Sequence, residues 1–248
     1  MAASNQPKSF VDSFRILHDS DTDMGTVMLR KRWSMALERD VFEMTVDGKL
    51  MMSSAVAVSE CALAERALAL LPNQELNVLI GGLGFGFTTQ TALADPRIRE
   101  LTVIERLAPV VEWHRSGILP WSEEFRFDPR LEVVTGDFFA FLARDPVSRY
   151  DAILIDIDDS PDRLWHGSHA AFYESTGLAA IPKHLSPGGV FALWCATPPS
   201  KAFLDKVEAT FETTELVPVR FENPCLRQPE TNYVLLARTP NQERRFAT

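Results

Sequence analysis

The stretch "LIGGLGFGFTTQ", residues 79–90, ends one apolar run and begins another, and within it Gly82, Gly84 and Gly86 alternate with bulky residues. Glycine loses more conformational freedom on folding than any other residue, so this alternation indicates a place where side chains are excluded. The stretch follows a strand-like run and precedes a helix-like one. In open α/β sheets, ligands bind beyond the carboxyl ends of the strands. The glycines therefore predict a strand–turn–helix unit whose main chain approaches a ligand closely.

The chain from residue 77 onward has the rhythm of a parallel sheet. Short apolar runs rich in Val and Ile alternate with apolar helical segments, which is typical of strands covered on both faces. The runs are "NVLIGG", "ELTVIER", "RLEVVTG", "YDAILIDI", "GGVFALWC", "ELVPVRFEN" and "TNYVLLAR". The last two are joined by a loop instead of a helix, so they predict an antiparallel pair. We therefore expect an α/β fold with a seven-stranded, mostly parallel, doubly wound sheet whose last strand is antiparallel.

The N-terminal part differs in pattern from this region. Residues 1–22 are polar and have no clear period, so we expect a tail or an edge strand there. In residues 23–55, side chains sort alternately onto opposite faces, as they do in strands, and Asp47-Gly48 is the preferred dipeptide of a type I′ hairpin turn. This segment predicts a small antiparallel β unit. Residues 56–248 then form the nucleotide-binding and catalytic domain, beginning with a helix at residues 57–72.

Composition excludes several functional classes. The chain has 248 residues, a net charge of -9 and three cysteines in no CxxC pair. The acidic balance argues against a general nucleic-acid binder, which needs a basic face. The widely spaced Cys61, Cys195 and Cys225 predict neither a disulfide framework nor a zinc site. No apolar stretch reaches the roughly 18 residues of a membrane span, and the N-terminus has no apolar signal segment. We therefore expect a cytoplasmic protein without a membrane partner.

Residues that follow the first three parallel strands indicate a nucleotide site. The glycines have the spacing GxGxG, whereas the dinucleotide fingerprint is GxGxxG, so an adenosyl sulfonium nucleotide is favoured over NAD. Glu105 ends the second strand, where an acid suits the two hydroxyls of a ribose. Asp137 follows the third strand and fits either an adenine amino group or a helix N-cap. The expected nucleotide-binding residues are Gly81, Gly82, Gly84, Gly86, Glu105, Asp137 and Phe138.

Three acids crowd the end of the fourth parallel strand, in "LIDIDDSP". Like charges so close raise the pKa of at least one carboxyl group, and such a carboxylate takes a proton from an attacking amine or holds a cationic one. The three acids are Asp156, Asp158 and Asp159, and solvation alone is the simplest account of Asp158. The nearby His166 and His169 suggest a metal site, but no HExxH-type spacing is present, and we expect no metal.

Three further side chains, Trp113, His114 and Trp121, follow the second helix of the parallel region. They fit core or lid packing better than the wall of an acceptor pocket. His184 lies late in a helix, where a histidine suits the helix dipole.

Taken in order, "VLIGGLGFG", "VIE", "GDFFAFL", "YDAILIDIDD" and "SPGGVFAL" resemble the spermidine synthase (polyamine aminopropyltransferase) family over residues 41–240. The resemblance implies a class I methyltransferase-like sheet behind an N-terminal β domain that often makes homodimers. It implies transfer of an aminopropyl group from decarboxylated S-adenosylmethionine to putrescine. In that family, the residue at Asp156 activates the amine and the one at Asp159 binds it. The residues at Glu105 and Asp137 bind the ribose and adenine.

The departures from the family pattern fall mostly on the amine side. The family's "GGGDGG" loop reads "GGLGFG" here, so Gly84 replaces the aspartate that faces the donor amine. The family's glutamine falls at Met51 and its substrate tyrosine near Glu60. The C-terminal proline- and tyrosine-bearing motif is replaced by "NPCLRQPETNYVLLA". Four functions stay open: aminopropyl transfer to a small amine, methyl transfer from S-adenosylmethionine to a small molecule, nucleoside binding without catalysis, and NAD-dependent oxidoreduction.

Overall fold

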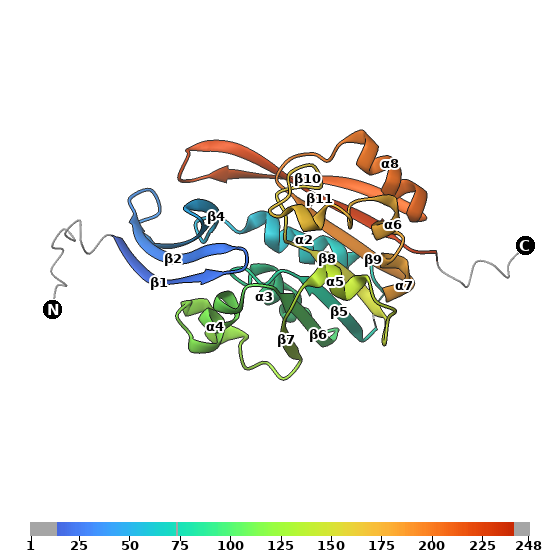
Figure 1. The fold of residues 1–248 in the computed structure, drawn as a ribbon, viewed down its shortest axis with the longest axis horizontal. Coiled ribbons are helices and arrows are strands. Elements are labelled where there is room, and N and C mark those ends of the chain that lie inside the picture. Colours follow the sequence, from blue (N-terminus) through green and yellow to red (C-terminus); the bar gives the residue numbers. More distant parts are fainter. Residues whose placement is uncertain (1–13, 73, 241–248) are drawn as a thin grey trace, which may run out of the picture. The chain divides into compact units, whose positions relative to one another are not determined.

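The apolar runs of the second part of the chain pair into one seven-stranded sheet in the computed structural model, which describes residues 14–72 and 74–240. The strand order is β10-β11-β9-β8-β5-β6-β7 (Figure 1). β5 pairs in parallel with β6 and β8, β6 with β7, and β8 with β9, whereas β11 runs antiparallel to β9. The strands are β5 (Leu76–Gly81), β6 (Ile98–Glu105), β7 (Leu131–Thr135), β8 (Tyr150–Ile155), β9 (Leu185–Cys195), β10 (Thr213–Asn223) and β11 (Gln228–Arg238). The predicted sheet is confirmed.

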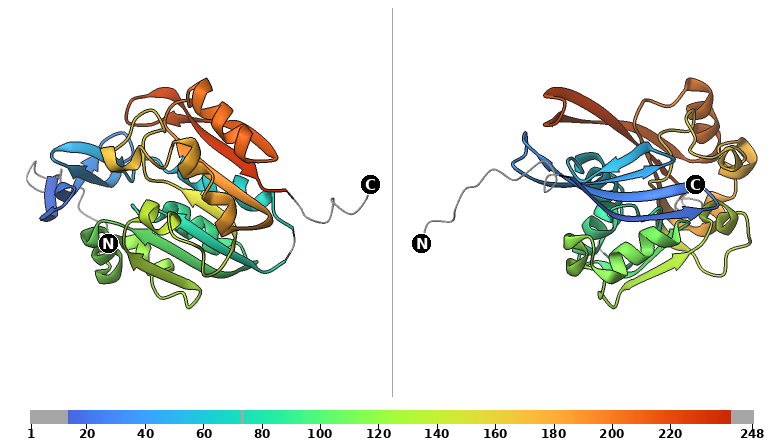
Figure 2. Two further views of the ribbon diagram at one scale, coloured as in Figure 1. Left: turned by 45° about the vertical axis from the view of Figure 1, so that its right-hand side comes forward. Right: turned by 60° about the vertical axis from the view of Figure 1, so that its left-hand side comes forward.

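Helices cover both faces of this sheet (Figure 2). Val78, Leu79 and Ile80 of β5 are completely buried, as expected for a strand with a helix layer on each side. Leu79 belongs to a core cluster with residues of α5, α6, α7 and α8, while α2 contacts β8 and β9. The helices are α2 (Val58–Ala69), α3 (Phe87–Ala94), α4 (Ala108–Ser116), α5 (Phe138–Leu142), α6 (Ser175–Leu178), α7 (Ile181–His184) and α8 (Lys201–Thr210), with short 3-10 turns η1 (Pro120–Glu124) and η2 (Gly167–His169).

The N-terminal part forms its own antiparallel sheet. Its four strands are β1 (Phe14–Thr22), β2 (Gly25–Ser34), β3 (Arg39–Val46) and β4 (Lys49–Ser53), in that spatial order. Asp47 and Gly48 have φ of 48° and 77°, the left-handed backbone that a type I′ turn requires, so the predicted hairpin is confirmed. Residues 14–22 are the edge strand β1, and the remainder of the predicted tail lies outside the described residues.

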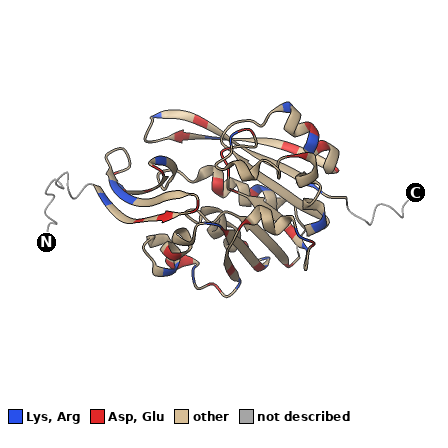
Figure 3. Cartoon of the chain, in the orientation of Figure 1, with Lys and Arg blue, Asp and Glu red and all other residues tan. Residues whose placement is uncertain are grey.

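The chain divides into two compact units, and the division does not coincide strictly with the boundary between residues 55 and 56 that the sequence predicts. Among the described residues, one unit comprises residues 14–56 with 222–229, and the other comprises residues 57–72, 74–221 and 230–240. Acidic and basic residues are interspersed over the elements of both (Figure 3). In the described part of the chain, every helix is too short or too polar to cross a bilayer.

Strand register brings the predicted site residues to one edge of the sheet. Gly81, the last residue of β5, pairs with Ile104 of β6 and Ile155 of β8, and Glu105 pairs with Thr135 of β7. Four consecutive carboxyl ends therefore lie level with one another. The segments that follow them carry the glycine turn, Glu105, Asp137 and the three aspartates.

Candidate active site

Contacts within the protein determine the conformation of the glycine turn. Gly82, Gly84 and Gly86 have φ of 90°, 49° and 81°, a backbone region that other residues rarely adopt. A Cβ on Gly81 would lie 2.7 Å from the ring of Phe138, and one on Gly86 would lie 2.6 Å from the ring of Phe125. A Cβ on Gly82 would clash with the main-chain carbonyl of Asp156. Neighbouring protein atoms thus suffice to exclude side chains at these positions, a cause that the sequence did not reveal.

The carboxylate of Glu105 binds main-chain N–H groups of this turn. Its carboxylate accepts hydrogen bonds from the main-chain N–H of Leu83 at 2.8 Å and of Leu107 at 2.7 Å, with a longer contact of 3.4 Å to the N–H of Gly84. Oε2 accepts from both Leu83 and Gly84, whereas Oε1 accepts from Leu107, so Oε1 is the oxygen with more room for another donor. Burial raises the pKa of Glu105, and these backbone hydrogen bonds oppose the rise.

The main-chain carbonyls of the turn accept hydrogen bonds from two of the three side chains expected beside the loop after the second helix; His114 lies within α4 itself, and Trp121 lies in η1. His114 Nε2 lies 2.9 Å from the carbonyl oxygen of Gly84, and its Nδ1 lies 2.7 Å from the hydroxyl of Ser122. Burial lowers the pKa of His114 to about 4, so the ring is neutral and donates through Nε2. Trp121 Nε1 donates to the carbonyl of Phe85 at 2.6 Å. His114 and Trp121 brace the turn, and Trp113 is buried in the core.

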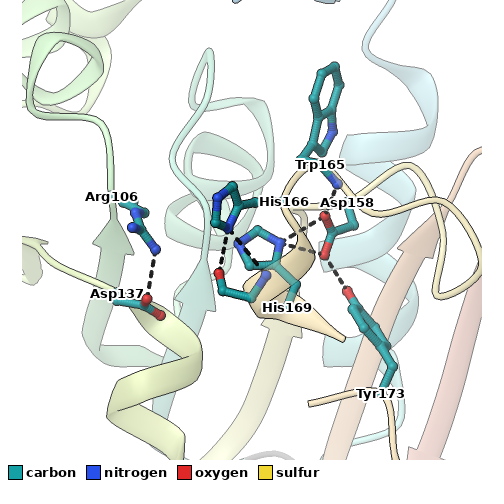
Figure 4. A network of polar contacts seen from close by, with 8 residues as sticks. Arg106, Asp137, Asp158, Trp165, His166, His169 and Tyr173 are labelled. Carbon is teal, nitrogen blue, oxygen red and sulfur yellow. Dashed lines mark hydrogen bonds and ion pairs between the residues drawn. The ribbon is translucent and has the colours of Figure 1, made fainter. Parts of the chain in front are cut away.

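Asp137 is the predicted N-cap and also half of an ion pair. Its Oδ1 accepts from the main-chain N–H of Ala140 at 3.0 Å, which caps α5. Its Oδ2 accepts from Arg106 at 2.8 Å (Figure 4). Arg106 follows Glu105 directly, so two consecutive residues contact different parts of the site. Glu105 contacts the glycine turn, and Arg106 contacts Asp137 after β7. Sequence patterns do not reveal this ion pair, because Arg106 and Asp137 are 31 positions apart in the chain.

Asp156 follows β8 as a partly buried acid with one side-chain donor among the described residues. Its Oδ2 accepts from the hydroxyl of Thr88 in α3 at 2.8 Å. Burial, followed by the negative charge of Glu60, raises the pKa of Asp156 to about 7, while the Thr88 bond works in the opposite direction. The predicted rise in the pKa of an acid at this strand end is confirmed, but its source is burial and a glutamate from α2.

The other two aspartates have different surroundings from Asp156. Asp158 is buried, and it accepts from the main-chain N–H of Trp165, from His169 and from the hydroxyl of Tyr173 (Figure 4). Simple solvation of Asp158 was therefore the wrong expectation. Asp159 has a side chain 25% exposed and lies 3.5 Å from Arg163. Within the described residues, no three acidic, histidine or cysteine side chains are grouped to hold a metal ion.

With this geometry established, the chain was compared with known proteins. No protein-family model matches it. It is 32% identical over 170 residues to polyamine aminopropyltransferase 2 of Pseudomonas aeruginosa, covering 66% of this chain and 47% of that protein. The chain is thus similar in sequence to an aminopropyltransferase. It is also 34% identical over 123 residues to putrescine N-methyltransferase 4 of Nicotiana tabacum, covering 50% of this chain and 30% of that protein. The chain therefore spans less than half of the length of these two relatives.

The structural likeness extends over most of the fold. Spermidine synthase from Thermotoga maritima aligns with 90% of this chain and 72% of its own, with a TM-score of 0.72 and 20% identity. The shared feature is the fold, an N-terminal β sheet and a seven-stranded mixed sheet.

Glu60 lies close enough to Asp156 to affect its charge, which no pattern in the sequence indicates. It lies in α2, near the position of the family's tyrosine, and it appeared there only as a departure. Its carboxylate accepts from Ser59 at 2.8 Å, and burial raises its pKa. The hydroxyl of Thr88 contacts both the carbonyl of Glu60, at 3.3 Å, and the carboxylate of Asp156. A periodicity argument assigns Glu60 to a helix face and cannot reveal this pairing across 96 residues of sequence.

The first prediction concerns the turn. Gly82→Ala is expected to destabilise the protein by about 1–3 kcal/mol or more, because its left-handed backbone is strained for alanine and the new Cβ would meet the carbonyl of Asp156. Gly136→Ala is the matched control, since it also follows a strand at this edge but its Cβ would meet Ile104 at an ordinary 3.8 Å. Urea denaturation measures both. Equal stabilities for the two variants would contradict the steric account.

The second prediction concerns the charge of Asp156. In the folded protein the pKa of Asp156 is about 7, above the ordinary 3.8. The folded state is therefore more stable at low pH, where this carboxyl group is neutral, and it loses that stability as the pH rises through 7. Asp156→Asn is neutral at every pH. It should therefore raise the free energy of unfolding by roughly a few kcal/mol at pH 8 and little at pH 4, since each unit between folded and unfolded pKa corresponds to about 1.4 kcal/mol.

The control is Asp159→Asn, the same change in the same loop at a more exposed, ion-paired side chain. Asp159→Asn reports the effect of the same substitution away from the hydroxyl of Thr88. If thermal melts gave Asp156→Asn the same gain at pH 4 and pH 8, Asp156 would ionise like an ordinary carboxyl group.

Proposed function

We propose that the chain transfers an aminopropyl group from decarboxylated S-adenosylmethionine to a small amine, with Asp156 accepting the proton of that amine. The observation that carries the proposal is the pKa of Asp156, raised to about 7 by burial and by Glu60 at the end of β8. A base works best when its pKa lies near the working pH. The likeness to an aminopropyltransferase supports the reaction type.

The chemical step balances without any further reactant. The neutral nitrogen of the acceptor attacks the aminopropyl carbon bonded to the sulfonium, forming a C–N bond as the C–S bond breaks. The electron pair of the C–S bond stays on sulfur, and methylthioadenosine leaves. The nitrogen then carries one proton too many, which passes to a carboxylate oxygen of Asp156. The hydrogen bond from Thr88 fixes the other oxygen, so the accepting one is oriented by the protein.

The residues around the glycine turn fit the adenosyl part of the donor. Oε1 of Glu105 accepts from Leu107, while Oε2 accepts from both Leu83 and Gly84, so Oε1 is the oxygen proposed to accept from a ribose hydroxyl. Asp137 lies one strand further along the same edge, on the side proposed for the adenine, and the ring of Phe138 packs against Gly81. These contacts support binding of an adenosyl sulfonium by Gly81, Gly82, Gly84, Gly86, Glu105, Asp137 and Phe138.

The acceptor proposed for this site is a small amine. Glu60 and Asp156 together present buried negative charge, which attracts a cationic group once a ligand displaces water. Asp159 follows within three residues and is proposed to contact the acceptor, although Arg163 partly neutralises it. The homodimer implied by the resemblance stays a prediction.

Methyl transfer from S-adenosylmethionine is the second candidate. The observation that favours it is Gly84, a left-handed residue at the position of the aspartate expected to face the donor amine. The likeness to a putrescine N-methyltransferase supports the same alternative. The two reactions share the adenosyl site and the base, and they differ in the group that leaves sulfur.

The third prediction separates these reactions. Incubation with each donor and a panel of small amines should release methylthioadenosine from decarboxylated S-adenosylmethionine, detected by chromatography. Asp156→Asn should lower turnover by about 10²–10⁴-fold, because it keeps the shape and loses the proton acceptor. Its affinity for methylthioadenosine should be little changed, since the adenosyl contacts come from other residues.

Four results would contradict the proposal in different ways. Release of S-adenosylhomocysteine alone would establish methyl transfer. Full activity in Asp156→Asn would remove the assigned base and favour catalysis by proximity. Binding of methylthioadenosine without turnover of any tested amine would leave a nucleoside-binding module, whereas a thermal shift with NADH alone would restore the oxidoreductase alternative.

The fourth prediction concerns Glu60. Turnover per KM should rise with pH through about 7 as Asp156 loses its proton. Glu60→Gln removes the negative charge that opposes this ionisation, so the rising limb should move to lower pH. Glu65→Gln on the same helix is the control. If turnover per KM rises over the same pH range in Glu60→Gln as in the wild-type protein, burial alone sets the pKa of Asp156.

A further inference from the structure

An ion pair connects the ends of β6 and β7, on the side of the site proposed for the base of the nucleoside. Arg106 directly follows β6, and Asp137 follows β7 after Gly136. Nη1 of Arg106 donates to Oδ2 of Asp137 at 2.8 Å (Figure 4). The main-chain N–H of Gly136 also donates to the carbonyl of Glu105 at 2.9 Å. Backbone and side chains therefore hold the two strand ends together and place a cation beside an anion.

The protein orients the carboxylate of this pair and leaves it accessible. Oδ1 of Asp137 accepts from the main-chain N–H of Ala140 at 3.0 Å, while Oδ2 accepts from Arg106. A carboxylate has about four lone-pair sites, so both oxygens can accept a further hydrogen bond. The side chains of Arg106 and Asp137 are 31% and 35% exposed. A ligand at this edge of the sheet can therefore reach both members of the pair.

The guanidinium group changes what this part of the site offers to a base. The sequence predicts Asp137 alone on the adenine side, and an ionised carboxylate only accepts hydrogen bonds. Arg106 adds a planar group with several N–H donors, a shape that suits flat polar ligands. The pair thus presents a donor and an acceptor side by side.

Two purine bases differ in the order of their own donors and acceptors. In adenine, the amino group on C6 donates and N1 accepts, whereas in hypoxanthine the oxygen on C6 accepts and N1–H donates. A carboxylate alone would leave the C6 oxygen of hypoxanthine facing negative charge without a donor. A carboxylate beside a guanidinium can pair with either base, because Asp137 accepts from whichever group donates and Arg106 donates to the other.

We propose that Arg106 and Asp137 together bind the Watson–Crick edge of the purine, so that the site takes 6-oxopurine nucleoside thioethers as well as adenosyl ones. The inference rests on the proposed function for the place of the nucleoside. It goes beyond that function because the base is no longer restricted to adenine. Arg106 is the specificity-determining residue, since it supplies the donor that a 6-oxo group needs.

Stability alone gives a weak account of the pair. Ion pairs between partly exposed side chains contribute little to folding. The bond from Ala140 that caps α5 uses the other oxygen of Asp137, so the cap does not require Arg106. Removing the guanidinium group should therefore change which bases bind more than it changes the folded state.

The test measures two nucleosides by isothermal titration calorimetry. Methylthioadenosine and 5′-methylthioinosine share the ribose and the thioether and differ only at C6 and N1 of the base. The wild-type protein should bind them with dissociation constants within about 10-fold of each other, because the same two side chains pair with each edge. Arg106→Leu keeps an apolar side chain and loses the donors. It should weaken methylthioinosine by about 5- to 100-fold more than methylthioadenosine, since the C6 oxygen is left desolvated and unpaired.

Two further variants separate this role from a structural one. Arg99→Leu makes the same change at an ion-paired arginine near the other end of β6, and it should leave the ratio of the two dissociation constants unchanged. Arg106→Lys keeps a cationic donor without the planar fork and should restore part of the methylthioinosine binding. An equal loss of both nucleosides in Arg106→Leu would show that Arg106 only holds Asp137 in place. That result, or an unchanged ratio, would overturn the proposal.

Because binding and turnover are measured separately, the role of Arg106 and the proposed reaction can fail independently. If both nucleosides bind as expected and no amine is turned over, the reaction is wrong and the role of Arg106 stands. If methylthioadenosine is released in turnover but the ratio is the same in Arg106→Leu, the role of Arg106 is wrong and the reaction stands. Binding of neither nucleoside to the wild-type protein would overturn both.

Discussion

The arrangement of the site depends on the contact between the Glu105 carboxylate and the main chain of the glycine turn. Buried N–H groups of such a turn must find acceptors. Glu105, at the end of the adjacent strand β6, accepts from Leu83 at 2.8 Å and from Gly84 at 3.4 Å, and also from Leu107 after its own strand at 2.7 Å. The same carboxylate therefore ties β5 to β6 and fixes the turn, and only its remaining lone pairs are left for a ligand. A single acid links the fold to the proposed nucleotide site.

Much of the fold could be predicted because its signals are local. Continuous apolar runs such as "VLI" and "AILI" mark strands buried on both faces, and Asp47-Gly48 specifies its own turn. The positions of Glu105, Asp137 and Asp156 at one edge follow from the strand order alone, since carboxyl ends of parallel strands lie together. What could not be predicted depends on pairs distant in sequence: Arg106 with Asp137, His114 with Gly84, and Glu60 with Asp156.

The glycines also show what the sequence alone cannot predict. Their spacing indicated correctly that side chains are excluded, but the sequence could not say by what. The excluding groups are the carbonyl of Asp156 and the rings of Phe138 and Phe125, which come from three later segments. Close packing in protein interiors means that a backbone can be crowded as readily by its own chain as by a ligand. An alternating glycine pattern is therefore weaker support for a bound nucleotide than the strand-end position of the turn that contains it.

The aspartates after β8 show how one chain gives neighbouring acids different chemistry. A buried carboxylate is tolerated where hydrogen-bond donors replace its water, and the number of donors decides what it can do. Asp158 has Trp165, His169 and Tyr173 as donors, so its oxygens are committed to holding the loop. Asp156 has the hydroxyl of Thr88 among the described side chains and a glutamate nearby, so its charged form is disfavoured and its pKa rises to about 7. The acid with fewer donors is the one able to take up and release a proton near neutral pH. Charge alone did not distinguish Asp156 from Asp158 in the sequence, because the donors come from segments that only the fold brings to them.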